Sequence, residues 1–485
     1  MKVLDSGRDK VTNNGTFIFP KDEELTGDEL ISFVKYNTTH LNKRYRHNMH
    51  EYLGKHKILK DPVSQMGSDN KLVVNMPKYL VDTYNGFFSG IPPKITLDDE
   101  NQNKVLQDWN NAESMADVQS EISKQTDIYG KSIAFIYQGE DSQPHLAYSS
   151  PSHAFIIYDD TVARKPIAFV RYSIPDGETV DEAEGTIQYA DKFYKFKSTD
   201  IELDTDQNAV GVNPYGMVPA VEFYENEERQ GVFDGVDTLI QELDRALSQK
   251  ANQVEYFDNA YLAIMGILLD TDEEGNPKMD FKKNRVLYLP NIDPNSPEPM
   301  VEFLSKPDAD QIQEHLIDRL TNMTFQMSMV PNLNDEQFAG NSSGVALEYK
   351  LLPMVTKASS KERKFTQSFR ELYKIVFTVL FKQTQQDAWR DLQFQFTRNL
   401  PANVADEIAS AKNAEGIVSK ETQLSLLSFV QDPQAELKKM QEENAEAVKQ
   451  AQENMQAVPD YFKSDEDGNP DNSVDEGEPD GSEEE

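Results

Sequence analysis

The sequence predicts an α+β protein that is mainly α-helical and divided into several regions. Its 485 residues exceed the ~100 to 200 of a usual domain. Hydrophobic residues make up 38% of the chain and aromatic residues 10%, which is enough for buried cores. Short runs that suit strands gather in 132–223, and long runs with helical spacing follow them.

The first 233 residues should contain helices followed by an antiparallel sheet. We expect helices over Asp28 to Leu53 and over Asn75 to Phe88, the second with Pro77 in its first turn. Short apolar runs separated by turn residues then predict the strands, for example 132–137, 153–158 and 167–172.

The second half changes to long helical periods. Residues 432–457 lack glycine and are rich in helix formers, which predicts a polar helix, whereas 463–485 have almost no apolar residues and should be disordered. Between these regions and the sheet we expect, in chain order, a long helix (234–265), a Pro-rich insert with a strand at 285–289 (266–307), a helix capped by Asp308 (308–329), a loop broken by Pro331, Gly340 and Gly344 (330–344) and a long helix with Pro353 near its start (345–383).

Charge and cysteine content exclude several classes of protein. The net charge is −36, so we expect the chain not to coat DNA by neutralising phosphates. Residues 460–485 alone hold twelve acidic residues and one basic residue. The absence of cysteine excludes disulfide scaffolds and thiolate sites, and it fits an intracellular setting. The longest apolar run, 260–269, is too short for a membrane span of ~20 residues.

Three motifs imitate ligand sites without completing them. Gly130-Lys131-Ser132 resembles the end of a phosphate loop, but it leads into a predicted strand instead of a helix. The acidic turn at 270–275 resembles a calcium loop, but Phe281 stands where the bidentate carboxylate is needed. The acidic residues of 202–206 could imitate a two-metal catalytic site, but they lie in a predicted polar loop. We therefore expect no catalytic residues, no cofactor and no enzymatic activity.

One basic cluster stands out against the acidic composition. It is predicted either to be a solvated helix face or to contact nucleic acid or an acidic partner subunit. Neighbouring histidines at helical spacing could share a metal with a glutamate, although the surrounding cations would repel the ion. The residues are Lys43, Arg44, Arg46 and His47 for the basic cluster, and His47, His50 and Glu51 for the metal.

The order of these regions resembles the portal, or head-to-tail connector, proteins of tailed double-stranded DNA bacteriophages. Four segments are similar to the siphophage branch found in phages of Gram-positive hosts, and the resemblance covers roughly 28–430. The segments are Asn75-Met-Pro-Lys-Tyr-Leu-Val-Asp-Thr-Tyr-Asn-Gly-Phe-Phe-Ser-Gly-Ile-Pro-Pro, Ile128-Tyr-Gly-Lys-Ser, Asn213-Pro-Tyr-Gly-Met-Val-Pro and Ser342-Ser-Gly-Val-Ala-Leu-Glu-Tyr-Lys-Leu-Leu-Pro.

The resemblance implies a portal fold that forms a dodecameric ring around a DNA channel. The polar residues and glycines of 330–344 agree with a loop that contacts DNA locally and moves. The implied regions are the wing (1–233), stem helix 1 (234–265), the clip (266–307), stem helix 2 (308–329), the tunnel loop (330–344), a long wing helix with its following segment (345–398), the crown (399–459) and a disordered acidic tail (460–485).

Site residues and partners are expected accordingly. The ring would sit at one capsid vertex of the virion after assembly in the host cytoplasm, with no membrane contact, and would bind double-stranded DNA, the terminase large subunit, the head-to-tail adaptor and the major capsid and scaffolding proteins. The alternatives are another capsid-associated structural protein or a metal-dependent nucleic-acid enzyme. The expected residues are Asn334, Gln337, Phe338, Asn341, Ser342 and Ser343 for DNA contact, Gly340 and Gly344 as loop hinges, and Tyr288, Pro290, Asn291 and Pro294 for partner docking on the clip.

Overall fold

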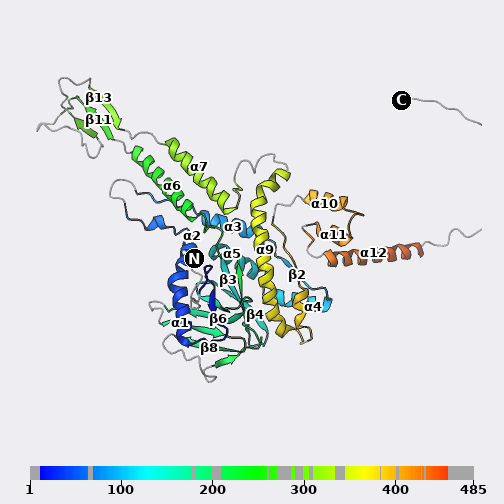
Figure 1. Ribbon diagram of the computed structural model, residues 1–485. Helices are drawn as coiled ribbons and strands as arrows, with labels where there is room; N and C mark the ends of the chain where they lie inside the picture. Colours follow the sequence, from blue (N-terminus) through cyan, green and yellow to red (C-terminus); the bar gives the residue numbers. More distant parts are fainter. Residues whose placement is uncertain are drawn as a thin grey trace, which may run out of the picture. The chain divides into compact units, whose positions relative to one another are not determined.

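The computed structural model divides into two compact units, 1–400 and 401–485, which we treat separately (Figure 1). The first unit contains the sheets, and the described residues of the second unit contain helices but no strand. The residues that the structure describes are 11–63, 69–175, 182–197, 209–258, 261–267, 269–270, 286–289, 299–304, 310–333, 344–382, 384–399, 404–427, 429–430 and 433–456.

The first predicted helix is confirmed, with an interruption. Helix α1 (Gly27–Tyr36) begins at Thr26 with a capping box to Glu29, passes through a π-helical turn at Asn37–Leu41, and continues as α2 (Asn42–Tyr52). Asn37 and Asn42 lie in and next to this turn, and both are buried. Their side-chain amides donate hydrogen bonds to the carbonyl oxygens of 151 and 152, so the irregular turn serves tertiary contacts.

Three further helices precede the main sheets. Helix α3 (Met76–Ser89) confirms the second predicted helix, with the Asn75 side chain accepting from the Lys78 N–H. Helices α4 (Glu100–Ala112) and α5 (Met115–Tyr129) were not predicted from the sequence. Helix α4 is polar apart from a few positions, such as the buried Trp109, so its apolar period is weak.

The strands form two main sheets instead of one. The six-stranded sheet has the order β1-β5-β6-β7-β8-β9, with β1 parallel to β5 and the other pairs antiparallel. The strands within 132–223 pair antiparallel, as predicted, but they are divided between two sheets. The second sheet, β10-β3-β4, is antiparallel. The strands are β1 (Phe17–Phe19), β3 (Lys131–Gln138), β4 (Pro144–Ser149), β5 (Ala154–Asp159), β6 (Pro166–Ser173), β7 (Glu184–Gln188), β8 (Lys192–Lys197), β9 (Ala209–Val212) and β10 (Ala220–Tyr224).

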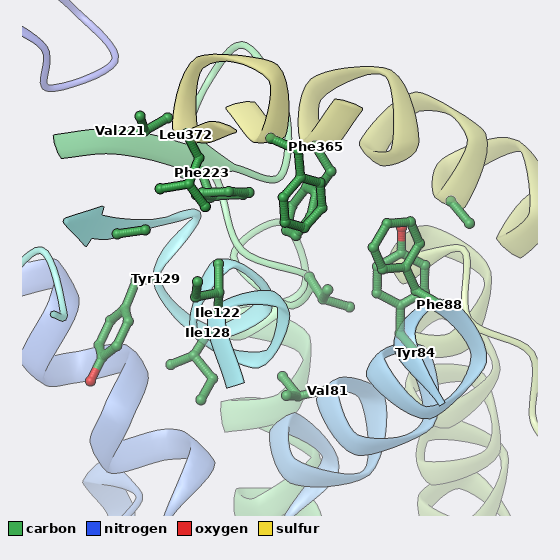
Figure 2. Close-up of a cluster of buried hydrophobic side chains, with 14 of the residues drawn as sticks. Val81, Tyr84, Phe88, Ile122, Ile128, Tyr129, Val221, Phe223, Phe365 and Leu372 are labelled. Carbon is green, nitrogen blue, oxygen red and sulfur yellow. The ribbon is translucent and has the colours of Figure 1, made fainter. Parts of the chain in front are cut away.

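The largest core of the first unit gathers around helix α9 (Gly344–Leu380), which confirms the predicted third long helix with Pro353 inside it. Aromatic side chains of α9 face strand β10, as Figure 2 shows. The ring of Phe223 lies 5.3 Å from that of Phe365 and 5.0 Å from that of Phe369, both edge to face. A short 3₁₀-helix η5 (Gln386–Asp391) follows, and strand β14 (Gln393–Gln395) then pairs with β2 (Lys94–Thr96).

Helices α6 (Asp237–Asp258) and α7 (Asp310–Ser328) pack against each other (Figure 1). The helix predicted over 234–265 is wrong at its end, because Tyr261–Met265 forms strand β11. Strand β11 pairs with β12 (Val286–Leu289) on one side and β13 (Met300–Leu304) on the other. This apolar run suits either structure, and pairing along both edges satisfies its backbone as a strand. Asp308, the predicted N-cap, lies outside the described residues.

The second unit is helical. It contains α10 (Val404–Asn413), α11 (Lys420–Ser425) and α12 (Pro433–Gln456), and α11 packs against α12. Helix α12 confirms the polar helix predicted over 432–457. The predicted acidic tail, 460–485, lies outside the described residues.

Candidate functional site

Much of both sites expected from the sequence lies outside the described residues. These are 334–343 of the predicted tunnel loop, with Asn334, Gln337, Phe338, Gly340, Asn341, Ser342 and Ser343, and Pro290, Asn291 and Pro294 of the clip. The structure describes Tyr288 within β12 and Gly344 as the first residue of α9. It also describes 330–333 and the helices that border the loop, so the site can be built from its flanks.

The three-stranded sheet β12-β11-β13 lies within the predicted clip and carries apolar side chains on its surface. Tyr288 pairs with Ile264 on β11, and its hydroxyl oxygen accepts a hydrogen bond from the Leu269 N–H at 3.3 Å. Strands β12 and β13 are the edges of this sheet among the described residues. The exposed apolar residues are Leu287, Leu289, Met300 and Val301. Strand edges that carry exposed apolar side chains favour pairing with another chain.

Helix α7 has one face toward α6 and another that is apolar and exposed. Leu320 and Thr324 are buried on the inner face. Ile312 is 74% exposed and Met327 is 56% exposed. We call this face the stem stripe; it consists of Ile312, Leu316, Met323 and Met327. Residues at this spacing lie on one side of a helix.

The start of the predicted tunnel loop, 330–333, is fixed to the rest of the first unit. Helix α7 ends at Ser328, Met329 follows with a φ of +62°, and Val330 is fully buried. The Lys357 ammonium on α9 donates to the Ser328 carbonyl oxygen at 3.1 Å, which places a cation at the end of α7 where the helix dipole favours it. The Leu333 N–H donates to the hydroxyl of Tyr79.

One turn further along α9, Lys361 is completely buried in a charged cluster. Its ammonium lies 2.5 Å from a carboxylate oxygen of Asp127 on α5 and 3.1 Å from one of Glu225, just after β10. Burial raises the pKa of the Asp127 carboxyl well above its ordinary value, against the opposing effect of Lys361. Burial also lowers the pKa of Lys357, against the attraction of the same two carboxylates. Helix α9 is thereby tied to α5 and β10 by charge as well as by aromatic packing.

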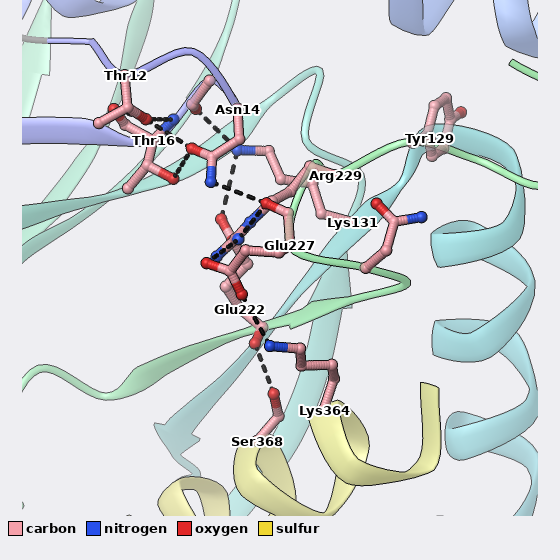
Figure 3. A network of polar contacts seen from close by, with 12 residues as sticks. Thr12, Asn14, Thr16, Tyr129, Lys131, Glu222, Glu227, Arg229, Lys364 and Ser368 are labelled. Atoms are coloured by element: carbon pink, nitrogen blue, oxygen red, sulfur yellow. Dashed lines mark hydrogen bonds and ion pairs between the residues drawn. The ribbon is translucent and has the colours of Figure 1, made fainter. Parts of the chain in front are cut away.

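A second buried network lies beside it (Figure 3). Glu222 on β10 accepts from Lys131 at 3.3 Å and from Arg229 at 3.0 Å. Burial alone would raise the pKa of Glu222, but these two cations outweigh it and lower the pKa. The Glu222 carbonyl oxygen accepts from the Ser368 hydroxyl on α9. Lys131 therefore serves a buried ion pair, which excludes the phosphate-loop interpretation of Gly130-Lys131-Ser132.

Helix α2 is joined to helix α6 by alternating carboxylates and imidazoles. His47 Nε2 lies 3.0 Å from Asp237, and the buried His56 Nδ1 lies 2.5 Å from Asp244. Glu51 stands between the two rings, 3.8 Å from His47 and 3.5 Å from His56. These five residues form what we call the wing–stem chain.

Burial and polar contacts within the wing–stem chain shift the pKa values of His47, Glu51 and His56. The hydrogen bond to Asp237 raises the pKa of His47. Burial alone would lower the pKa of His56, but Asp244 and Glu51 outweigh it and raise the pKa. Burial raises the pKa of the Glu51 carboxyl.

The structure brings together a different set of residues from the metal site considered for His47, His50 and Glu51. His50 is not part of the cluster, and Asp237 takes its place, with the three ligand atoms within 4.8 Å of one another. Both nitrogens of His47 already face carboxylates, so hydrogen bonding accounts for the arrangement. The acidic residues of 202–206 lie outside the described residues. So do residues 271–275 of the acidic turn predicted at 270–275.

The comparison with known proteins identifies the class to which this architecture belongs. Residues 31–450 match the family model described as phage portal protein, SPP1 Gp6-like. The chain therefore belongs to this family, and its function is that of a bacteriophage portal protein. A portal protein of Bacillus phage SPP1 is 24% identical over 387 residues, covering 75% of this chain and 74% of that protein.

Within the described part of the chain, no helix has both the length and the hydropathy that a bilayer span requires.

Proposed function

We propose that the chain assembles into a dodecameric ring whose central channel carries double-stranded DNA into and out of the capsid. Helices α6 and α7 act as the stem, the sheet of β11, β12 and β13 acts as the clip, and the second unit acts as the crown. The proposal rests mainly on the stem stripe. In an isolated chain the apolar face of α7 is exposed to water, whereas a neighbouring stem would cover it.

The clip supports the same proposal. Its edge strands and exposed apolar residues are suited to pairing with a neighbouring subunit and to docking of the terminase large subunit and the head-to-tail adaptor. Tyr288, Pro290, Asn291 and Pro294 are the residues proposed for docking. Replacing 291–298 with a Gly-Ser linker should leave the body folded and abolish binding of both partners to purified rings. Retention of both would contradict the docking role.

The tunnel loop is proposed to contact DNA and to move during translocation. Lys357 and Tyr79 fix its first residues, so movement would be confined to the segment after 333. Gly340→Pro and Gly344→Pro should form normal rings that fill capsids poorly, with Phe338→Ala milder because backbone freedom remains. Wild-type filling by both proline variants would make the segment a simple connector.

The ring is proposed to sit at a capsid vertex with the major capsid and scaffolding proteins around it, after assembly in the host cytoplasm, and to have no catalytic step of its own. Electron microscopy of the purified protein tests this directly. Rings with a central hole and twelve-fold class averages are expected. Large shells or rods would favour another capsid protein, and metal-dependent DNA cleavage by the purified protein would favour an enzyme.

A further inference from the structure

A cleft lined by cations lies on the amino-terminal part of the first unit. The π-helical turn, helix α2 and the 3₁₀-helix η2 (Lys57–Lys60) contribute its walls, which enclose about 620 Å³. Five basic or imidazole side chains line it and no carboxylate does. We call it the basic cleft; its lining is Thr38, Thr39, Lys43, Arg46, His47, His50 and Lys60.

The basic side chains share one face because of helical spacing. Lys43, Arg46 and His50 follow at intervals of three and four, and the opposite side of α2 buries Tyr45 and Asn48 in the core. His47 is engaged by Glu51 and Asp237 of the wing–stem chain, so the free charge of the cleft comes from the other cations.

The lysines and arginine of this cleft lack ion pairs among the described residues. No described carboxylate lies within salt-bridge distance of Lys43, Arg46 or Lys60, whereas Arg44 on the same helix pairs with Asp234. The positive charges of the cleft affect a neighbouring imidazole. After burial, Lys60 and Lys55 are the main causes that lower the pKa of His50. In a chain with 84 acidic residues, unpaired cations held together by secondary structure mark a site for an anion.

We infer, on the basis of the proposed ring, that the basic cleft binds the acidic carboxyl-terminal segment, 460–485, of a second copy of the chain. This segment supplies twelve carboxylates against one lysine. Helix α12 ends at Gln456, and the 29 residues after it can span up to about 100 Å when extended. Because the segment is attached to the protein, weak contacts suffice for substantial occupancy. Duplex DNA is a poorer candidate, since the −36 charge of the whole chain opposes it.

Zero-length cross-linking of the full-length protein tests the inference. A carbodiimide joins lysine amines to carboxylates in contact, and mass spectrometry identifies the pairs. We expect Lys43 and Lys60 to be the lysines most often joined to carboxylates of 460–485. Raising the salt from about 50 mM to about 500 mM NaCl shortens the screening length from about 14 Å to about 4 Å and should lower these products at least about ten-fold. Rings assembled from mixed 15N-labelled and unlabelled subunits should give links between two chains, and links confined to one chain would overturn the inference.

A matched pair of variants separates the cleft from general charge effects. Arg46→Glu should lower the Lys43 and Lys60 products several-fold, whereas Arg363→Glu, which reverses an exposed cation on α9, should not change them. The inference is overturned if the segment couples equally to lysines outside the cleft, or if Arg46→Glu behaves as wild type. It is also overturned if a stoichiometric DNA duplex displaces the segment, which would make the cleft a nucleic-acid site. None of these results bears on ring formation, which microscopy of the same samples reports.

Discussion

The body around α9 and the stem helix α7 place polar and apolar residues in opposite ways. Helix α9 buries an ammonium, that of Lys361, between two carboxylates. Helix α7 leaves Ile312 and Met327 largely exposed. Buried charges are tolerated only when they are paired, whereas exposed apolar side chains bind partners. The region around α9 therefore has its contacts complete within one chain, whereas α7 needs a neighbouring subunit to cover its apolar face.

The largest effect should come from removing the charge at the centre of the body. Lys361→Met keeps most of the side-chain volume but leaves Asp127 and Glu225 buried without a cation, so we expect a loss of ~3–5 kcal/mol of unfolding free energy. Lys364→Met, which breaks a more exposed pair with Glu227, should cost ~1 kcal/mol or less. Urea denaturation measures both, and equal losses would contradict the distinction.

The second-largest loss of stability should come from Gly130, because the backbone at 229 approaches it closely at the end of α5. Its φ is +86°, and a Cβ there would lie 1.9 Å from the Arg229 carbonyl oxygen. We expect Gly130→Ala to cost more than about 2 kcal/mol. Gly86→Ala, within α3 and with open space around a Cβ, should instead stabilise by ~0.5–1 kcal/mol. A Gly130→Ala protein as stable as wild type would refute the close approach.

The wing–stem chain predicts a smaller dependence of stability on pH. The pKa values of His47 and His56 are raised by folding, so their contribution is complete below the ordinary value of about 6.5 and is lost as pH rises through the higher folded values. The melting temperature should therefore fall by a few degrees between about pH 6 and about pH 8.5.

The control for this pH dependence removes one imidazole. His56→Asn should have a lower melting temperature at the acidic end and a flatter profile, since one of the two titrating groups is gone. Identical slopes for wild type and variant would assign the pH dependence to groups elsewhere in the protein.

The smallest effect on stability is expected in the stem stripe. Ile312→Ser with Met327→Ser should change the unfolding free energy of the monomer by no more than ~0.5 kcal/mol, because both side chains are exposed. The same variant should weaken ring formation in sedimentation velocity. Val162→Ser removes a fully exposed apolar side chain from the body and should leave both properties unchanged. Equal assembly of all three proteins would remove the stripe from the subunit interface.

The elements that the sequence predicted well are those with long regular periods. Helix α9 and the polar helix α12 were found nearly to their ends. The end of α6 was not, because Tyr261 and Ile264 fit both helical spacing and a strand, and pairing with β12 and β13 decides the outcome. Short-range periodicity carries no information about such partners.

The charged cluster of the body could not be predicted either. Around Lys361 the sequence reads Lys-Ala-Ser-Ser-Lys-Glu-Arg-Lys, which is typical of a solvated helix face. Its partners, Asp127 and Glu225, lie more than a hundred residues away along the chain. The predicted roles of 334–343 and of Pro290, Asn291 and Pro294 remain predictions, since those residues lie outside the described part of the chain.

Hydrogen exchange on monomer and assembled protein tests the difference between body and stem most directly. Amides of α3, α5 and 361–376 should be equally protected in both states, because their contacts are complete within one chain. Amides of α7 and of strands β12 and β13 should be protected strongly only after assembly. Equal protection of α7 in both states, or a large gain in protection in the body on assembly, would contradict the account.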